Sequence, residues 1–230
     1  MEAKRETVLQ QAIDHYHSLM EDEELTQASL KALHDELKRA RLIFGGRRLA
    51  PYLRPDFVLE SDWNRVSVIC ETIFSTLQKV KDAAVKSDEL LDELGVTDVE
   101  RELVAIDPKY NQACPTARLD SFLTQDSYAY VELNGESPAG IAFSDSAREI
   151  FLNLPLMKKF QETYEVFGFE GRPRLHETLL ECYEEFSDGN PKENPTIAIV
   201  DLKDLPTVEE FKLCQEYFES KGHKAIICSP

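Results

Sequence analysis

The sequence predicts a mixed α/β fold, and three patterns support this prediction. Apolar residues recur at helical spacing through most of the first 105 residues. Two short segments at 118–120 and 130–134 alternate apolar and polar residues, which is typical of an antiparallel hairpin. Near the end of the chain, two apolar runs rich in β-branched residues flank a helical pattern and predict a βαβ unit.

These patterns divide the chain into a helical region at 1–110, a hairpin with helices at 111–190, and the βαβ unit at 191–230. The helical region has two apolar stripes at helical spacing, which are Val8, Leu9, Ala12, Ile13, Tyr16, Leu19 and Met20, and then Trp63, Val66, Ile69, Ile73, Leu77 and Val80. Between them, glycines and prolines at 44–55 predict a loop with three arginines. Such a loop could bind phosphate or carboxylate, although solvated basic loops are common.

Further local signals mark where helices begin and end. Thr97 and Glu100 predict a capping box at the start of a short helix. After the hairpin, Ser144 and Asp145 predict the start of one helix, and Pro155 suits the first turn of the next. A third helix at about 174–186 ends before a Ser-Asp-Gly-Asn-Pro run, which is the best linker candidate in the chain.

The predicted βαβ unit has strands at 196–201 and 224–228. A capping box that starts with Thr207 begins its helix and Gly222 ends it, and the crossover is expected to be right-handed. A parallel sheet of two strands is too small to be a stable domain. We therefore expect this sheet to continue in a longer protein.

Ligand sites in parallel sheets lie at the carboxyl ends of the strands. In this chain those ends are near Asp201 and Ser229. No glycine-rich dinucleotide loop follows the first strand, and the chain has no P-loop motif. The sequence therefore does not support a dinucleotide site or a P-loop.

Composition narrows the classes of partner. The net charge is −17, whereas nucleic acids and anionic membranes bind clustered Lys and Arg, so we expect neither as a partner. An apolar fraction of 42% is enough for a folded core, and no run of about 18 apolar residues predicts a membrane span. The N-terminus also lacks the apolar core of a signal peptide, and we expect a cytoplasmic protein.

Cysteines and histidines do not indicate a zinc site. The five cysteines are scattered without a CxxC pair, which fits reduced thiols in packing positions. His15 and His17 would point to opposite sides of a helix and cannot share one ion there. Zinc chemistry is therefore not expected.

The hairpin carries the strongest chemical signal. Strand side chains alternate between faces, so Arg118 and Asp120 share one face of the first strand. Glu132 and Asn134 share one face of the second. If the turn at 124–127 centres on Asp126, position 120 lies opposite 132 and position 118 lies opposite 134. Two facing carboxylates repel each other, whereas a cation between them would reverse the sign, and these oxygen ligands suit Mg²⁺.

A plainer interpretation of the same pattern stays open. One face of an antiparallel hairpin is commonly wet, with apolar residues such as Leu119, Val131 and Leu133 on the other face. An ion pair between Arg118 and a carboxylate would also explain the cluster without a ligand. The small-residue loop at 135–140 favours a ligand, because such loops allow close approach to the backbone.

Arg118-x-Asp120, followed twelve residues after the Asp by Glu132-x-Asn134, resembles the metal-binding hairpin of circularly permuted, glutathionylspermidine synthetase-like ATP-grasp proteins. The resemblance covers roughly residues 110–230, including a βαβ unit similar to the pre-ATP-grasp domain. It implies that the Asp, the Glu and the Asn coordinate Mg²⁺. It also implies that the Arg contacts the transferring phosphate.

The loop that follows resembles the segment facing the acceptor substrate, and Glu136 and Ser137 become candidate substrate contacts. The implied activity is ATP-dependent ligation of a small-molecule carboxylate to an amine, with ATP and Mg²⁺ as cofactors. The nucleotide-binding half is expected after Pro230, so this portion alone is expected to be inactive. The alternative is a non-catalytic scaffold or binding module that retains the fold.

Overall fold

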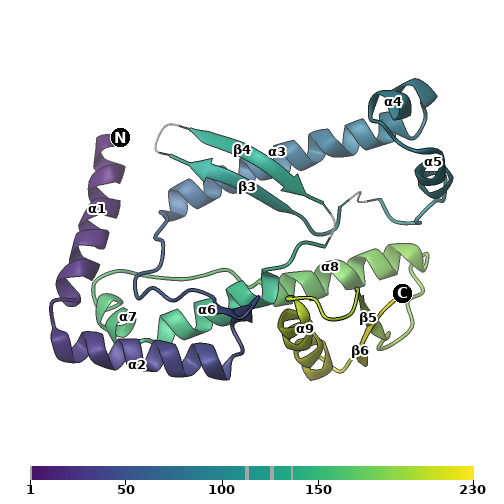
Figure 1. The fold of residues 1–230 in the computed structure, drawn as a ribbon. Helices are drawn as coiled ribbons and strands as arrows, with labels where there is room; N and C mark the ends of the chain where they lie inside the picture. Colours follow the sequence, from purple (N-terminus) through teal and green to yellow (C-terminus); the bar gives the residue numbers. More distant parts are fainter. Residues whose placement is uncertain (1, 112–113, 125–126, 136) are drawn as a thin grey trace. The chain divides into compact units, whose positions relative to one another are not determined.

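The computed structural model describes residues 2–111, 114–124, 127–135 and 137–230 of the chain (Figure 1). It is a mixed α/β protein, as predicted. Its helices are α1 Glu2–Leu19, α2 Glu23–Arg39, α3 Glu60–Ala84, α4 Asp88–Glu93, α5 Asp98–Val104, α6 Ile141–Asn153, α7 Pro155–Phe160, α8 Gly171–Phe186 and α9 Val208–Ser220. Its strands are β1 Ile43–Phe44, β2 Arg47–Arg48, β3 Arg118–Leu123, β4 Tyr128–Asn134, β5 Ile197–Val200 and β6 Ala225–Cys228.

The chain forms two compact units, each assembled from segments that are distant in sequence. Unit 1 consists of residues 1–58, 138–176 and 193–230. Unit 2 consists of residues 59–137 and 177–192. Helix α8 therefore contributes its first residues to unit 1 and the rest to unit 2.

The core of unit 1 joins the N-terminal helices to α7. Tyr16 of α1 and Phe160 of α7 are buried, and their rings meet edge to face at 5.3 Å between centroids. Phe57 stacks on Phe160 at 5.0 Å, so three distant segments share one aromatic cluster. Leu33 and Leu37 of α2 are fully buried as well. The apolar residues that recur at helical spacing in the sequence thus pack together into a continuous apolar core.

Side chains from other helices cap two helix N-termini of unit 1. The Asp145 carboxylate, only 2% exposed, accepts backbone N–H groups of Gly171 and Arg172 at 2.7 and 2.9 Å. Its Oδ2 also accepts the Arg172 Nε at 3.1 Å. The prediction that Ser144 and Asp145 begin a helix is therefore wrong, because α6 already begins at Ile141 and Asp145 caps α8 instead.

Glu210 of α9 caps the N-terminus of α6. Its carboxylate is 4% exposed and accepts the N–H groups of Gly140 and Ala142 at 2.8 and 2.9 Å. Gly140 occupies the N-cap position with a φ of 119°, which a side chain would strain. Each buried carboxylate thus caps a helix from a distant segment, and α6 has no local side-chain cap of its own.

The βαβ unit forms with the predicted elements. Strands β5 and β6 pair in parallel, with Ile197 opposite Ala225 and Val200 opposite Cys228. Thr207 makes no side-chain cap to α9, so the capping box predicted there does not form, whereas the one at Thr97 does.

The predicted loop at 44–55 contains a small hairpin that the sequence analysis did not identify. Strands β1 and β2 pair antiparallel across Gly45 and Gly46, whose φ values are 55° and 78°. Two consecutive residues with positive φ are typical of a type I′ hairpin turn. A Gly-Gly pair between two short apolar or basic segments is the signal that marks it.

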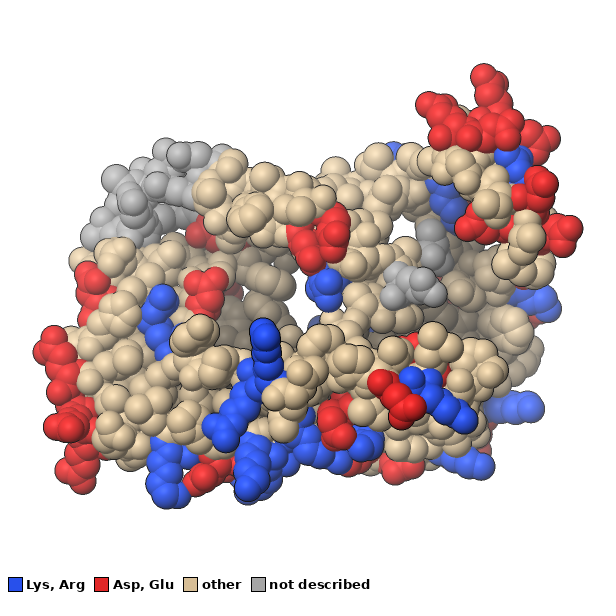
Figure 2. All heavy atoms as spheres, viewed as in Figure 1, with Lys and Arg blue, Asp and Glu red and all other residues tan. Residues whose placement is uncertain are grey.

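Acidic side chains gather over α4 and α5 in Figure 2. Arg101 lies among them and pairs with Asp88 and Asp92 at 3.3 and 2.5 Å. This cluster accounts for part of the negative charge of the chain. Separately, no helix within the described residues has the length and apolar character needed to cross a membrane.

Candidate functional site

Strands β3 and β4 pair in the register predicted from the sequence. Arg118 lies opposite Asn134, and Asp120 lies opposite Glu132. Directly paired residues of an antiparallel ladder point to the same face. The structure therefore brings the four predicted side chains together on one face of the hairpin.

A β-bulge interrupts this register at one position. Asp120 pairs with Glu132 but Ser121 pairs with Tyr130, which leaves Val131 as an extra residue without a cross-strand partner. Val131 is 64% exposed. The strict alternation expected from the sequence therefore does not continue past Glu132, because the bulge adds one residue to β4.

Contacts along each strand hold the polar face. Arg118 Nε donates to Asp120 Oδ1 at 2.8 Å, and both side chains are partly exposed, at 49% and 39%. This hydrogen bond and charge raise the pKa of Arg118 further above its usual range, and the charge of Glu132 acts in the same direction. On β4, Asn134 Nδ2 donates to Glu132 Oε1 at 3.1 Å. Each carboxylate thus already has a polar neighbour on its own strand.

The opposite face of the hairpin packs towards α3. The Tyr130 hydroxyl lies 3.7 Å from the Cys70 Sγ of α3, and the Tyr128 hydroxyl accepts a hydrogen bond from Ser121 at 2.8 Å. Arg65 of α3 donates to the Thr124 carbonyl at 3.3 Å. These contacts leave the carboxylate face directed away from the helix.

The loop after β4 begins close to Cys114. The Cys114 thiol donates to the Gly135 carbonyl at 3.0 Å, and a Cβ at Gly135 would lie only 2.9 Å from that sulfur. Ser137 is exposed and has a φ of 36°. Glu136 and the turn centre at 125–126 lie outside the described residues.

A cavity of about 380 Å³ lies between α3 and the open end of the hairpin. Its lining is mainly apolar and comprises Phe74, Ser75, Leu77, Gln78, Asn111, Cys114 and Leu133. Neither Asp120 nor Glu132 belongs to it. The two carboxylates thus lie opposite each other across the ladder, but neither of them lines this cavity.

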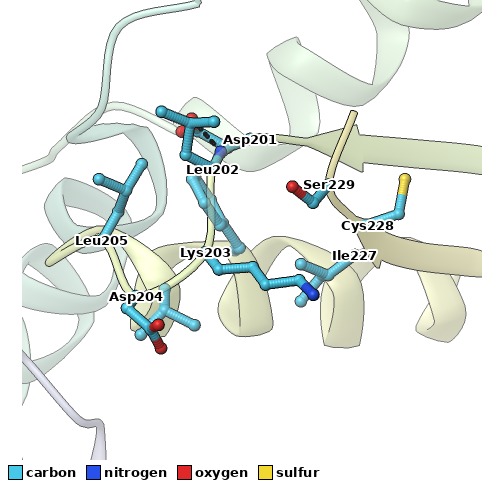
Figure 3. A pocket seen from close by; sticks show the side chains of 10 residues that line it. Asp201, Leu202, Lys203, Asp204, Leu205, Ile227, Cys228 and Ser229 are labelled. Carbon is cyan, nitrogen blue, oxygen red and sulfur yellow. Dashed lines mark hydrogen bonds between the residues drawn. The ribbon is translucent and has the colours of Figure 1, made fainter.

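A second hollow lies at the carboxyl ends of β5 and β6, where the sequence places a possible ligand site (Figure 3). It has a volume of about 260 Å³, and both predicted positions, Asp201 and Ser229, line it. Lys203 and Asp204 line it too, and the sequence analysis did not identify them. Their place in the loop directly after a parallel strand is the signal that could have found them.

Metal ligation can be judged from the donor atoms present. Within the described residues, no three or more His, Cys, Asp or Glu side chains form a group able to hold a metal ion. The hairpin offers two carboxylates and one amide, and Mg²⁺ commonly binds through one or two carboxylates together with phosphate and water. The donor set therefore fits Mg²⁺ shared with a phosphate ligand better than an ion held by protein alone.

Comparisons of the chain with protein-family models, with curated proteins and with solved structures found no match. The hairpin and the β5–β6 hollow are therefore the features of the chain that bear on its function.

Proposed function

We propose that the polar face of β3–β4 binds Mg²⁺ and the phosphates of ATP, as part of a circularly permuted ATP-grasp ligase that joins a carboxylate to an amine. The observation that carries the proposal is the register, in which Asp120 faces Glu132 and Arg118 faces Asn134. The parallel β5–α9–β6 unit supports it, because a pre-ATP-grasp domain would contain such a unit.

Each side chain has a distinct role in this proposal. Asp120, Glu132 and the Asn134 amide oxygen would hold Mg²⁺, which when bound neutralises charge on phosphate oxygens. The amide nitrogen now donates to Glu132, so the Asn134 side chain would have to turn over to present its oxygen. Arg118 would offer its guanidinium fork to phosphate oxygens, which a lysine could not copy.

A specific observation favours a second candidate, a non-catalytic scaffold or binding module. Arg118 already pairs with Asp120, and Asn134 already donates to Glu132, so each of the two carboxylates has a polar partner without any ligand. An exposed ion pair of this kind adds little stability, and it needs no ATP to explain it.

Manganese binding separates the two candidates. Mn²⁺ serves as a spectroscopic substitute for Mg²⁺, and electron paramagnetic resonance would measure its binding to the chain with and without ATP. Asp120→Asn and Glu132→Gln are each expected to weaken Mn²⁺ binding about tenfold or more. Arg118→Gln is expected to weaken ATP binding in the presence of Mn²⁺ while leaving binding of Mn²⁺ alone unimpaired.

The matched control is Glu89→Gln, an exposed carboxylate on α4 of the same unit. It should leave Mn²⁺ binding unchanged. If Mn²⁺ binds equally to the parent chain, both hairpin variants and the control, the metal role is wrong. Absence of Mn²⁺ binding to a folded parent chain, checked by circular dichroism, would favour the scaffold.

A further inference from the structure

The hollow at the carboxyl ends of β5 and β6 combines an apolar floor with a rim of both charges (Figure 3). The floor comes from the first turn of α9 and from β6, through Val208, Phe211 and Ile227. Val208 and Ile227 are each 38% exposed. Covering such apolar surface with an apolar group is favourable, because it removes that surface from water.

The rim carries two carboxylates and one ammonium group. Asp201 and Asp204 supply the negative charges, and the Lys203 side chain runs along the hollow towards Ile227 in Figure 3. Asp201 Oδ1 accepts the backbone N–H of Leu202 at 2.7 Å, which orients its carboxylate at the end of β5. Lys203 and Asp204 form no ion pair with another described residue, so their charges remain available.

The size of the hollow limits its occupant. At about 260 Å³ it lies just below the usual range for ligand pockets, about 300–1,000 Å³, and suits a molecule of amino-acid size. An anion alone would be repelled by the two carboxylates, and a cation alone would leave Lys203 without a partner. A zwitterion with an apolar side chain matches the floor and both charges together.

We infer that this hollow is a binding site for a small zwitterion with an apolar side chain, such as an apolar amino acid. The ammonium group of the ligand lies near Asp204, its carboxylate lies near Lys203, and its side chain covers Val208 and Ile227. The site uses no residue of the β3–β4 hairpin. The inference therefore stands or falls independently of the proposed ATP-grasp function.

Three matched probes test the inference on the full chain. L-leucine carries both charges, 3-methylbutylamine lacks the carboxylate, and 4-methylpentanoate lacks the ammonium group. Titrations followed by ¹H–¹⁵N NMR should shift the amide signals of residues 201–208 and 227–229. L-leucine should bind about threefold or more tightly than either single-charge probe, a difference in line with one exposed charge pair.

Two variants assign the charges. Lys203→Met should weaken the binding of L-leucine about threefold and leave the binding of 3-methylbutylamine unchanged. Asp204→Asn should weaken the binding of both probes. Lys224→Met is the matched control, because Lys224 is exposed and precedes β6, at the other end of the strand. It should change none of the three affinities.

Three results would overturn the inference. They are shifts confined to other parts of the chain, equal binding of L-leucine and 3-methylbutylamine, and no shift with any probe up to its solubility limit. The NMR spectrum of each variant also reports whether it is folded, so a loss of binding cannot be confused with unfolding.

Discussion

At the residue scale, buried polar groups of unit 1 lie close together around α9. Glu210 and Cys214 occupy successive turns of this helix and are 4% and 8% exposed. Burial, together with the charge of Glu210, raises the pKa of the Cys214 thiol to about 12, against an opposing effect of Arg172. The thiol therefore behaves as a neutral packing residue, consistent with the interpretation of the cysteines as packing residues.

The raised pKa of Cys214 predicts a loss of stability at high pH. The unfolded thiol ionises near pH 9.0 and the folded one near 12, so the stabilisation is complete below pH 9. Between these values the unfolded state binds fewer protons, and the free energy of unfolding falls by about 1.4 kcal/mol per pH unit from this group. Urea denaturation of the parent chain and of Cys214→Ala from pH 8 to 11 should show a shallower decline in the variant. Parallel curves would contradict this assignment.

At the element scale, the register of the hairpin follows from a local sequence pattern, whereas its bulge is linked to a tertiary contact with α3. The turn and the two-residue period of strands were sufficient to predict that Asp120 faces Glu132. They could not predict the bulge at Val131, because the bulge serves to bring Tyr130 towards Cys70 of α3. Strict alternation from Glu132 would place Tyr130 on the carboxylate face instead.

Deleting Val131 tests this account of the bulge. The deletion leaves Tyr130 directly before Glu132, so strict alternation then keeps the tyrosines towards α3 and the carboxylates on the other face. We therefore expect the free energy of unfolding to change by no more than about 1 kcal/mol. Thermal denaturation followed by circular dichroism measures it. Val131→Thr is the control, because this exposed side chain should matter by no more than about 0.5 kcal/mol. A loss of about 2 kcal/mol or more on deletion would contradict this account, because it would show that the bend and twist of the bulge are themselves needed for packing.

At the scale of the whole molecule, long-range caps connect segments that are far apart in the chain. Within unit 1, Glu210 of α9 caps α6, Asp145 of α6 caps α8, and the Ser29 hydroxyl of α2 accepts the Leu156 N–H of α7 at 2.9 Å. Each cap joins two packed helices and also satisfies a buried donor, which would otherwise cost free energy. Assembly of unit 1 therefore depends on polar contacts as well as on its apolar core.

Glu210 is the sharpest test of this dependence. Glu210→Ala leaves the N–H groups of Gly140 and Ala142 without their acceptor, and we expect a loss of about 2–4 kcal/mol. Glu210→Gln keeps one oxygen acceptor and should lose less. Urea denaturation measures both, with the exposed Glu219→Ala on the same helix as a control within about 0.5 kcal/mol. Equal stability of Glu210→Ala and this control would exclude the capping role.

The sequence by itself determined the elements whose signals are local. Helical spacing, the alternation of β3 and β4, and the apolar runs of β5 and β6 are repeated over neighbouring residues, so each can be recognised within its own segment. The same logic placed Arg118, Asp120, Glu132 and Asn134 on one face, and Asp201 and Ser229 at one end of a sheet.

Only the tertiary structure decided which distant groups meet. Asp145 has the sequence context of a local cap, yet its partners are the N–H groups of Gly171 and Arg172. Glu210 resembles the end of a capping box, yet it caps α6. The free N–H groups at a helix N-terminus can donate to any carboxylate that packing brings within reach. The spacing of residues in the sequence does not show which distant carboxylate that will be.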